Sequence, residues 1–295
     1  MKCLLLINSS SGNADGVDGD KELIAALTKA YGIVHKKVYK AEDRFDIAKE
    51  SEGYDILVLC GGDGTFNYAI NALRDKNIEL YYIPCGTFND CAHTLKKLDS
   101  ANTQRGQFKL DLGEINGRLF SYVAAAGSFT PIGYLPKSKH KKVFKRLVYY
   151  LYAFKEYKVH RINASVKADD RSFEGCYTLI MAVNSRYVFG FNFNRLFNLN
   201  DGKGQLLLIK APTGPLRLIK MFFLFFRAFF IGFKSEYESE NIKFVSFRRC
   251  LIRLDKPQDF CVDGERLTSG LANEICMHKE RGRVILTGTK DFLSK

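Results

Sequence analysis

The chain has 295 residues, of which 46% are hydrophobic and 26% are charged. This composition excludes a disordered protein, and the length is sufficient for two domains, each with its own core. The formal net charge of +13 predicts an anionic partner, and a nucleotide, a nucleic acid or an anionic membrane surface would each satisfy it.

The first hundred residues alternate between predicted strands and predicted helices. The apolar run at residues 4–7 is too short for a signal peptide. We interpret it as the first strand. A helix at 20–32, a strand at 33–39 and a helix at 43–51 follow it. Strands that alternate with helices predict a parallel sheet with right-handed crossovers, and ligands of such sheets gather at the carboxyl ends of the strands.

A glycine turn at residues 60–67, Cys-Gly-Gly-Asp-Gly-Thr-Phe-Asn, is the most informative stretch of the chain. It follows an apolar run at 55–59, and Phe66 begins an apolar pattern with helical spacing. Glycine lets a backbone approach a ligand closely, and the N–H groups at a helix start favour phosphate. Because Asp63 would repel phosphate, the motif predicts that this acid holds Mg²⁺ or accepts a hydrogen bond from a hydroxyl.

A second Gly-Thr turn, at residues 84–90, follows the predicted strand at 80–83. Either turn alone has a structural explanation, since Thr87 or Asn89 can simply cap the next helix. Two such turns at the same edge of one sheet favour a phosphate site instead. The first half of the chain therefore predicts metal-assisted phosphate chemistry.

Beyond about residue 105 the pattern changes to short strands and tight turns. Asn116-Gly117, between segments 109–115 and 118–124, predicts a hairpin, because Asn-Gly supplies the positive φ values of a type I′ turn. More strands are predicted, the last two as a closing pair, at residues 161–167, 176–183, 206–209, 243–247, 250–254, 274–278 and 283–287. This half of the chain predicts an antiparallel β domain.

Two stretches interrupt the strand pattern, and each has two interpretations. Residues 137–146 form a dense basic run, which is either a solvated face or a contact with an anionic surface. Residues 216–233 predict an apolar helix in which Arg217, Lys220 and Arg227 share one stripe, and three cations argue against a membrane span. This helix is expected either at a membrane interface or against the sheet with a thin exposed edge.

The cysteines show no Cys-x-x-Cys pair and no metal-binding spacing with the five histidines. Several lie inside apolar runs, so we expect reduced, buried cysteines of a cytoplasmic protein. The eight positions are Cys3, Cys60, Cys85, Cys91, Cys176, Cys250, Cys261 and Cys276.

Taken in order, the motifs resemble the diacylglycerol kinase catalytic-domain family, specifically its soluble bacterial lipid kinases. The resemblance rests on Asn-Ser-Ser-Ser-Gly at 8–12, Gly-Gly-Asp-Gly-Thr at 61–65, Pro-Cys-Gly-Thr-Phe-Asn-Asp at 84–90 and Asp-Gly-Glu at 263–265. The second motif alone is shared with NAD kinases and, loosely, with phosphofructokinases. Its combination with the third is more specific.

The resemblance implies an α/β fold in two domains. A parallel-sheet domain like that of NAD kinases and diacylglycerol kinases would span residues 1–105, with about 288–295 returning to it. A mostly antiparallel, β-sandwich-like domain that takes the lipid would span residues 106–287.

The resemblance also implies roles for individual residues. The nucleotide-binding residues would be Asn8, Ser9, Ser10, Ser11, Gly12, Gly61, Gly62, Asp63, Gly64, Thr65, Asn67 and Thr87. Asp63 would act in a magnesium-linked network with Asn89, Asp90 and Asp111, and Glu265 would be the general base for the lipid hydroxyl. Asp201 would hold a structural Mg²⁺. Phosphoryl transfer needs these parts, because it depends on positioning and charge neutralisation. From the residues alone, Asp263-Gly264 is also explained as a tight hairpin turn.

The expected function is therefore ATP- and Mg²⁺-dependent phosphorylation of a hydroxyl on a membrane lipid, diacylglycerol or a related lipid, in phospholipid biosynthesis. The protein is expected in the cytoplasm, peripheral at an anionic inner membrane face, without a transmembrane segment and without nucleic acid. An NAD kinase-like small-molecule kinase and a non-catalytic nucleotide- or membrane-binding protein are the alternatives. The identity of the lipid and the presence of a homodimer stay open.

Overall fold

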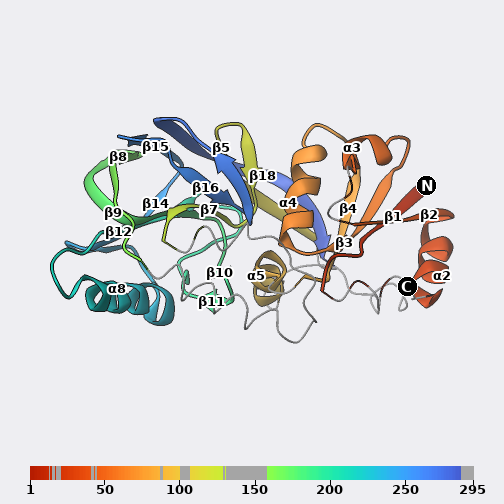
Figure 1. Ribbon diagram of the computed structural model, residues 1–295. Coiled ribbons are helices and arrows are strands. Elements are labelled where there is room, and N and C mark those ends of the chain that lie inside the picture. The colour runs from red at the N-terminus through yellow and green to blue at the C-terminus, as the bar shows by residue number, and fades with distance from the viewer. Residues whose placement is uncertain are drawn as a thin grey trace. The chain divides into compact units, whose positions relative to one another are not determined.

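The computed structural model describes residues 1–12, 21–40, 45–86, 89–99, 107–128 and 158–286, together with Ala14, Val17, Asp43 and Thr130. The chain divides into two compact units (Figure 1). Met1–Leu110 and Gly282–Lys295 form the first unit, and Asp111–Arg281 form the second. The segments at 137–146 and 291–295, like Thr87, lie outside the described residues.

The first unit is built on a parallel sheet with the strand order β2-β1-β3-β4. Its strands are β1 (Lys2–Asn8), β2 (Ile33–Tyr39), β3 (Ile56–Gly61) and β4 (Glu79–Pro84), and its helices are α2 (Lys21–Tyr31), α3 (Ile47–Glu50), α4 (Asp63–Ala72) and α5 (Asp90–Asp99). The last residues of β18 (Ala272–Leu286) pair in parallel with β4, Ile285 opposite Tyr81. The predicted alternation of strands and helices is confirmed.

Helices pack on both faces of this sheet. Leu23 and Leu27 of α2 share a core with Leu5 and Val58 on one face. On the other face Phe66 of α4 stacks on Tyr82, with the ring centroids 4.7 Å apart. All of β3 is buried, which explains its continuous apolar sequence. The carboxyl ends of these strands are therefore fixed by packing from both sides.

The second unit is mostly antiparallel, with an isolated parallel bridge between Asn194 and Phe233 and one helical segment. Its described strands are β5 (Gln107–Ile115, which begins in the first unit), β6 (Arg118–Phe120), β7 (Val123–Gly127), β8 (Ile162–Ala168), β9 (Arg171–Val183), β10 (Tyr187–Val188), β11 (Phe191–Asn192), β12 (Gly204–Lys210), β13 (Tyr237–Glu238), β14 (Ile242–Phe247), β15 (Arg249–Leu254), β16 (Asp259–Val262) and β17 (Glu265–Thr268), with most of β18. The main path runs β13-β14-β12-β9-β8-β15-β18, while β7 pairs with both β9 and β16. The predicted fold class, a parallel sheet followed by antiparallel strands, is confirmed.

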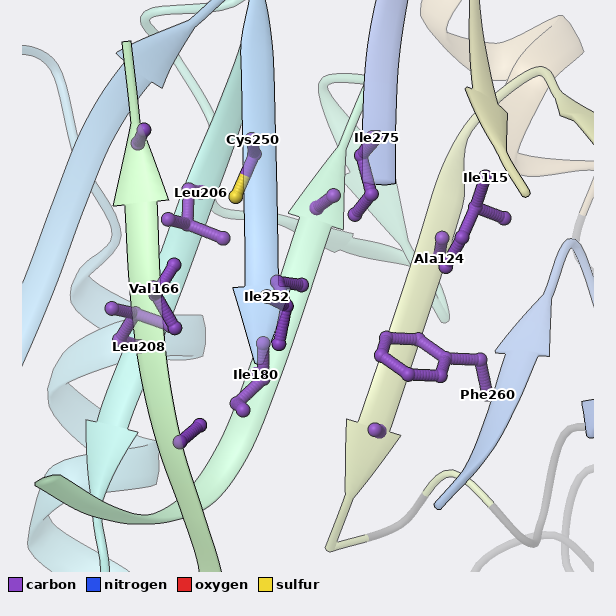
Figure 2. Close-up of a cluster of buried hydrophobic side chains, with 14 of the residues drawn as sticks. Ile115, Ala124, Val166, Ile180, Leu206, Leu208, Cys250, Ile252, Phe260 and Ile275 are labelled. Carbon is purple, nitrogen blue, oxygen red and sulfur yellow. The ribbon is translucent and has the colours of Figure 1, made fainter. Parts of the chain in front are cut away.

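Alternate side chains of these strands point into one hydrophobic core. Val166, Ile180, Leu206 and Ile252 meet there from four different strands (Figure 2). Phe260 of β16 enters the same cluster. Because the first part of β9 pairs with β8 and the last part with β7, both branches of the sheet share this core.

The predicted hairpin at Asn116-Gly117 is present, but its second strand is shorter than expected. Asn116 and Gly117 have φ values of 49° and 86°, and β6 ends at Phe120. The backbone N–H groups of Ser121, Tyr122 and Val123 bind the carboxylate of Asp263 instead of a neighbouring strand. This interaction separates β6 from β7.

Two further predictions were wrong in extent. Residues 274–278 and 283–287 were expected as two paired strands, but β18 continues through them to Leu286. The backbone N–H of Glu280, in the polar stretch that suggested a turn, donates to Asp111 Oδ1 at 2.8 Å, and the chain does not reverse. The second helix begins only at Ile47, because the side chain of Asp46 caps it by accepting the N–H of Lys49.

The apolar segment at 216–233 is helical. An α-helix, α8 (Arg217–Phe225), continues into a π-helical turn, η3 (Phe226–Ile231), which ends at Gly232. Figure 1 shows α8 beneath β9 and β12. Among the described residues, none of the helices has both the length and the apolar character needed to cross a membrane.

Candidate active site

Three loops of the first unit meet at the carboxyl ends of β1, β3 and β4. Asn8, the last residue of β1, donates from Nδ2 to Oγ1 of Thr65 at 2.8 Å, and its Oδ1 accepts the N–H of Ser10 at 3.0 Å. A Cβ at Gly12 would lie 3.5 Å from the carbonyl oxygen of Cys85. The first loop therefore touches both glycine turns, as the sequence predicts for ligand loops of a parallel sheet.

The two glycine turns touch each other through backbone atoms. A Cβ at Gly86 would lie 2.6 Å from the Cα of Gly62, and a Cβ at Gly61 would lie 2.5 Å from the Cβ of Thr65. Real side chains cannot approach that closely, so the contact requires glycine. Gly86 N–H also donates to Oδ1 of Asn89 at 2.7 Å. The glycines thus allow two turns to share one small region.

Asp63 joins the first turn to the helix that follows the second. Its carboxylate accepts the N–H of Asp90 at 3.1 Å and the N–H of Cys91 at 3.3 Å, both in the first turn of α5. The hydrogen bonds within a helix do not use the N–H groups of its first turn, and a carboxylate there also meets the positive end of the helix dipole. The structure therefore brings the carboxylate of Asp63 to the backbone of Asp90, in a capping role that the sequence does not indicate. The magnesium-linked role of the two acids stays a prediction.

The predicted nucleotide-binding residues fall into two groups. Asn8, Thr65 and Asn67 are buried. Asn8 and Thr65 join the first loop to the start of α4, and the carbonyl of Asn67 accepts a hydrogen bond from Asn71 of the same helix. Gly61 is buried as well. The other described members are partly exposed: Ser9, Ser10, Ser11, Gly12, Gly62, Asp63 and Gly64. Backbone donors at the start of α4 are thus the groups best placed for a phosphate.

A cysteine pair lies directly beneath these turns and was not singled out from the sequence. The Cys60 and Cys85 sulfurs lie 2.7 Å apart, and both residues are buried. The hydrogen bond to Cys85, together with burial, raises the pKa of Cys60. All eight cysteines are free and six are buried, so the expectation of reduced, mostly buried thiols agrees with the structure. The position of each cysteine immediately before a glycine turn was the available signal.

Asp263 of the second unit is a structural acid. Its carboxylate accepts hydrogen bonds from the N–H and Oγ–H of Ser121 and from the N–H groups of Tyr122 and Val123, at 2.5 to 3.1 Å. Burial raises the pKa of Asp263 against the effect of those donors. With φ values of 47° and 89°, Asp263 and Gly264 form the tight turn that joins β16 to β17.

Glu265 is the first residue after that turn, and it is exposed. The hairpin explanation of Asp263-Gly264 is therefore correct as local structure. The buried carboxylate of Asp263 accepts four hydrogen bonds, which fix the turn and with it the backbone of the neighbouring glutamate. The two interpretations of the motif are compatible.

Asp111 and Asp201 lie in the second unit, where Asp111 fastens a loop. Its carboxylate accepts the N–H of Gly202 at 2.6 Å and that of Glu280 at 2.8 Å. Burial raises the pKa of Asp111, against these hydrogen bonds. Asp201 accepts the N–H of Lys203 at 2.9 Å. In the part of the chain that is described, no group of three or more His, Cys, Asp or Glu side chains is placed to hold a metal ion.

Residues 2–112 match the model of the diacylglycerol kinase catalytic domain. The predicted resemblance to that family is confirmed. The match contains the first loop and both glycine turns, and it supports the predicted lipid kinase.

Relatives of this catalytic domain extend beyond the matched residues. The diacylglycerol kinase of Bacillus subtilis strain 168 is 28% identical over 241 residues, which cover 76% of each chain. The diacylglycerol kinase of Staphylococcus epidermidis strain RP62A is 29% identical over 203 residues, covering 63% of this chain and 61% of that protein.

Solved structures share the whole fold. A diacylglycerol kinase from Bacillus anthracis strain Sterne superposes with a TM-score of 0.67 over 97% of both chains, at 19% identity. A second structure from the same strain gives a TM-score of 0.72 over 97% of both chains, also at 19% identity. At this identity the likeness establishes the fold, including the antiparallel part beyond the diacylglycerol kinase catalytic-domain match.

Proposed function

We propose that the chain is an ATP- and Mg²⁺-dependent kinase that phosphorylates a hydroxyl of diacylglycerol or a related membrane lipid. The observation that carries the proposal is the meeting of the two glycine turns, Gly62 against Gly86, with Asp63 beside them. Glycine turns at the carboxyl ends of neighbouring parallel strands are suited to phosphate. The match to the catalytic domain of a lipid kinase family supports the same function.

The first unit would bind the ATP phosphates through backbone groups. The N–H groups at Gly62, Asp63 and Gly64 stand at the start of α4, where the helix dipole also favours negative charge. The backbone N–H groups of Ser10 and Ser11 already donate to Asn8, so these residues would contribute their side-chain hydroxyl groups, from the carboxyl end of β1. Because these donors are held by packing, phosphate binding requires little rearrangement of the backbone.

Asp63 is suited to bind Mg²⁺ through its carboxylate. Its carboxylate accepts the backbone N–H groups of Asp90 and Cys91, and an ionised carboxylate has about four lone-pair sites in all. Mg²⁺ in kinases is usually held by one or two carboxylates together with substrate phosphates. The ion, when bound, would neutralise charge on the transferring phosphoryl group. Asp63, assisted by Asp90, is the residue of this chain that would hold it.

Glu265 would act as the general base for the lipid hydroxyl. An exposed carboxylate that follows a rigid turn is accessible to a substrate, and its backbone is held in place by that turn. The hydrogen bonds from Ser121, Tyr122 and Val123 to Asp263 fix the turn. Glu265 would accept the hydroxyl proton as the oxygen attacks phosphorus. Diacylglycerol is the proposed acceptor because the relatives in Bacillus subtilis and Staphylococcus epidermidis are diacylglycerol kinases.

The NAD kinase alternative has less support. It would need an Asn-Glu pair after the glycine motif to contact a ribose, and the pair at Asn273-Glu274 is engaged otherwise. Asn273 accepts a hydrogen bond from Asn116 and donates one to the carbonyl of Gly270, while Glu274 pairs with Arg249. These contacts explain the pair as part of the β structure.

The proposal is tested by assaying transfer from radiolabelled ATP to diacylglycerol in mixed micelles and, separately, to NAD⁺. Wild-type protein should label the lipid and leave NAD⁺ unlabelled. Glu265→Gln should lower transfer by at least about 100-fold, as expected for loss of a general base, while the urea unfolding midpoint stays unchanged. Full activity of Glu265→Gln would show that the base is another group.

A further inference from the structure

The helical segment Leu216–Ile231, formed by α8, its N-cap residue and η3, carries an exposed apolar surface. Eight of the thirteen exposed large apolar side chains in the described chain lie on it, and the other five are scattered over other elements. At about 100 Å² for each half-exposed side chain, the eight expose roughly 800 Å², more than the largest patch of a typical monomer, about 300–600 Å². They are Leu216, Leu218, Ile219, Phe222, Phe223, Phe226, Phe230 and Ile231, each 41–66% exposed.

The opposite face of the same helix is firmly packed. Met221 and Ala228 are completely buried, and Leu224, Phe225 and Phe229 pack against the cluster formed by β9, β12 and β14. A Cβ at Gly232 would lie 2.6 Å from the carbonyl oxygen of Phe193, so the end of the helix is also fixed. The sheet therefore already holds one face, and the exposed rings do not result from a loosely attached helix.

The exposed rings form a continuous ridge. Phe222 stacks on Phe226 with centroids 6.1 Å apart, and Phe226 stacks on Phe230 at 5.2 Å, with interplanar angles of 25° and 15°. Because the rings stack on one another, their faces are not free to take the bases of a nucleic acid, which would bind by the same type of stacking. The ridge presents ring edges instead, as an interfacial helix does to lipid.

Cations border this ridge. Arg217 and Lys220 on α8 and Lys234 just beyond η3 are exposed, and within the described residues none of them forms an ion pair. Arg227 is already used, because it donates to the carbonyl of Gly232 at 2.8 Å and lies over the rings of Phe233 and Tyr237. Three cations beside an apolar ridge, in a chain with net charge +13, complement anionic lipid headgroups.

We propose that this face of Leu216–Ile231 docks the protein on an anionic lipid bilayer, with the phenylalanine ridge at the boundary of headgroups and acyl chains. A second copy of the chain fits less well, since a two-fold interface would surround the ridge with cations from both copies and with no acidic partner from the ridge's border. The inference deepens the proposed function by naming its membrane-binding element. It is tested without ATP, so its failure is distinguishable from failure of the kinase proposal.

The test is sedimentation of the full chain with vesicles of phosphatidylcholine mixed with phosphatidylglycerol, and with vesicles of phosphatidylcholine alone. Phe223→Gln and Phe230→Gln should each weaken partitioning roughly tenfold, and together roughly 100-fold. Arg217→Gln with Lys220→Gln should weaken binding to the mixed vesicles about 25-fold and leave binding to phosphatidylcholine unchanged.

Leu271→Gln is the matched control, because Leu271 is 52% exposed but lies outside the ridge. This variant should bind vesicles as the wild type does, and near-UV circular dichroism should show that all variants are folded. Wild-type vesicle binding by the folded double phenylalanine variant would overturn the proposal. A second result would also overturn it: the wild type is a dimer, the double variant is a monomer, and both bind vesicles equally. The ridge would then contact a second copy of the chain.

Discussion

The carboxylate of Asp63 accepts the backbone N–H of Asp90 at 3.1 Å, which ties the first glycine turn to the start of α5. Asp63 therefore has a structural task besides the metal-binding role that we propose for it. The two tasks depend on different properties of the side chain. Capping needs an acceptor oxygen, whereas binding Mg²⁺ depends on the negative charge.

Asp63→Asn and Asp63→Ala should separate these tasks. Asn keeps one of the two acceptor oxygens at this partly exposed site, so it should lower the unfolding free energy by less than Ala, which removes the cap and should cost about 1 kcal/mol. Both variants should lose at least about 100-fold in phosphoryl transfer, because both lack the charge that positions the metal. Denaturant unfolding and transfer assays measure the two effects. Wild-type transfer by Asp63→Asn would eliminate the metal-binding role.

Gly86→Ala should destabilise the first unit, because the new Cβ would lie 2.6 Å from both the Cα of Gly62 and Oδ1 of Asn89. We expect a loss of about 2 kcal/mol in urea unfolding, typical of forced overpacking. ATP affinity should fall with it, since the two turns must separate. Gly270→Ala is the control, as a Cβ there meets open space, and it should stay within about 0.5 kcal/mol of wild type. Equal stability of the two variants would show that the turns are not in close contact.

Asp263→Asn should be among the most destabilising isosteric changes in the second unit. Four donors converge on the buried carboxylate, and an amide would replace one acceptor oxygen with another donor. The expected cost is about 2–4 kcal/mol at neutral pH, measured by urea unfolding. Asp170→Asn, an exposed change in a different turn, should be nearly neutral. A neutral Asp263→Asn would mean that the turn before Glu265 is not held by this residue.

Glu236 should give a defined pH dependence. Burial raises the pKa of its carboxyl, but the Ser246 N–H and Arg171 outweigh burial and leave the pKa below its ordinary value of 4.5. A carboxyl whose pKa is lowered on folding contributes stability above its unfolded pKa and loses it as the pH falls.

Glu236→Gln should therefore be less stable than wild type at pH 7, and the difference should shrink as the pH falls below about 4.5. Urea titrations of both proteins across this range check it. A difference that persists undiminished at low pH would assign the effect to packing rather than to ionisation.

The sequence predicted those features that depend on local patterns. Apolar runs before Gly61 and Gly86 placed both turns at strand ends, and the parallel sheet then brought them to one edge. Asn116-Gly117 fixed a hairpin because its backbone requirement is local. These elements follow from periodicity and turn chemistry.

The features that the sequence did not predict depend on distant partners. The bonds from Ser121 to Asp263 join residues that are 142 positions apart, so the break between β6 and β7 was not visible in either segment alone. For α8 and η3 the apolar residues surround most of the helix, and periodicity could not show which side meets the sheet. In the structure, Met221 is buried in the core and Phe223 is exposed.

The most direct test of the central claim is to incubate the protein with radiolabelled ATP and a total-lipid extract, with and without Mg²⁺, and to identify the labelled product. The proposed function predicts one labelled phospholipid, phosphatidic acid if diacylglycerol is the acceptor, formed only with Mg²⁺ and absent with Asp63→Ala. Label that never enters the lipid phase, while the folded wild type binds ATP and the extract contains diacylglycerol, would contradict it.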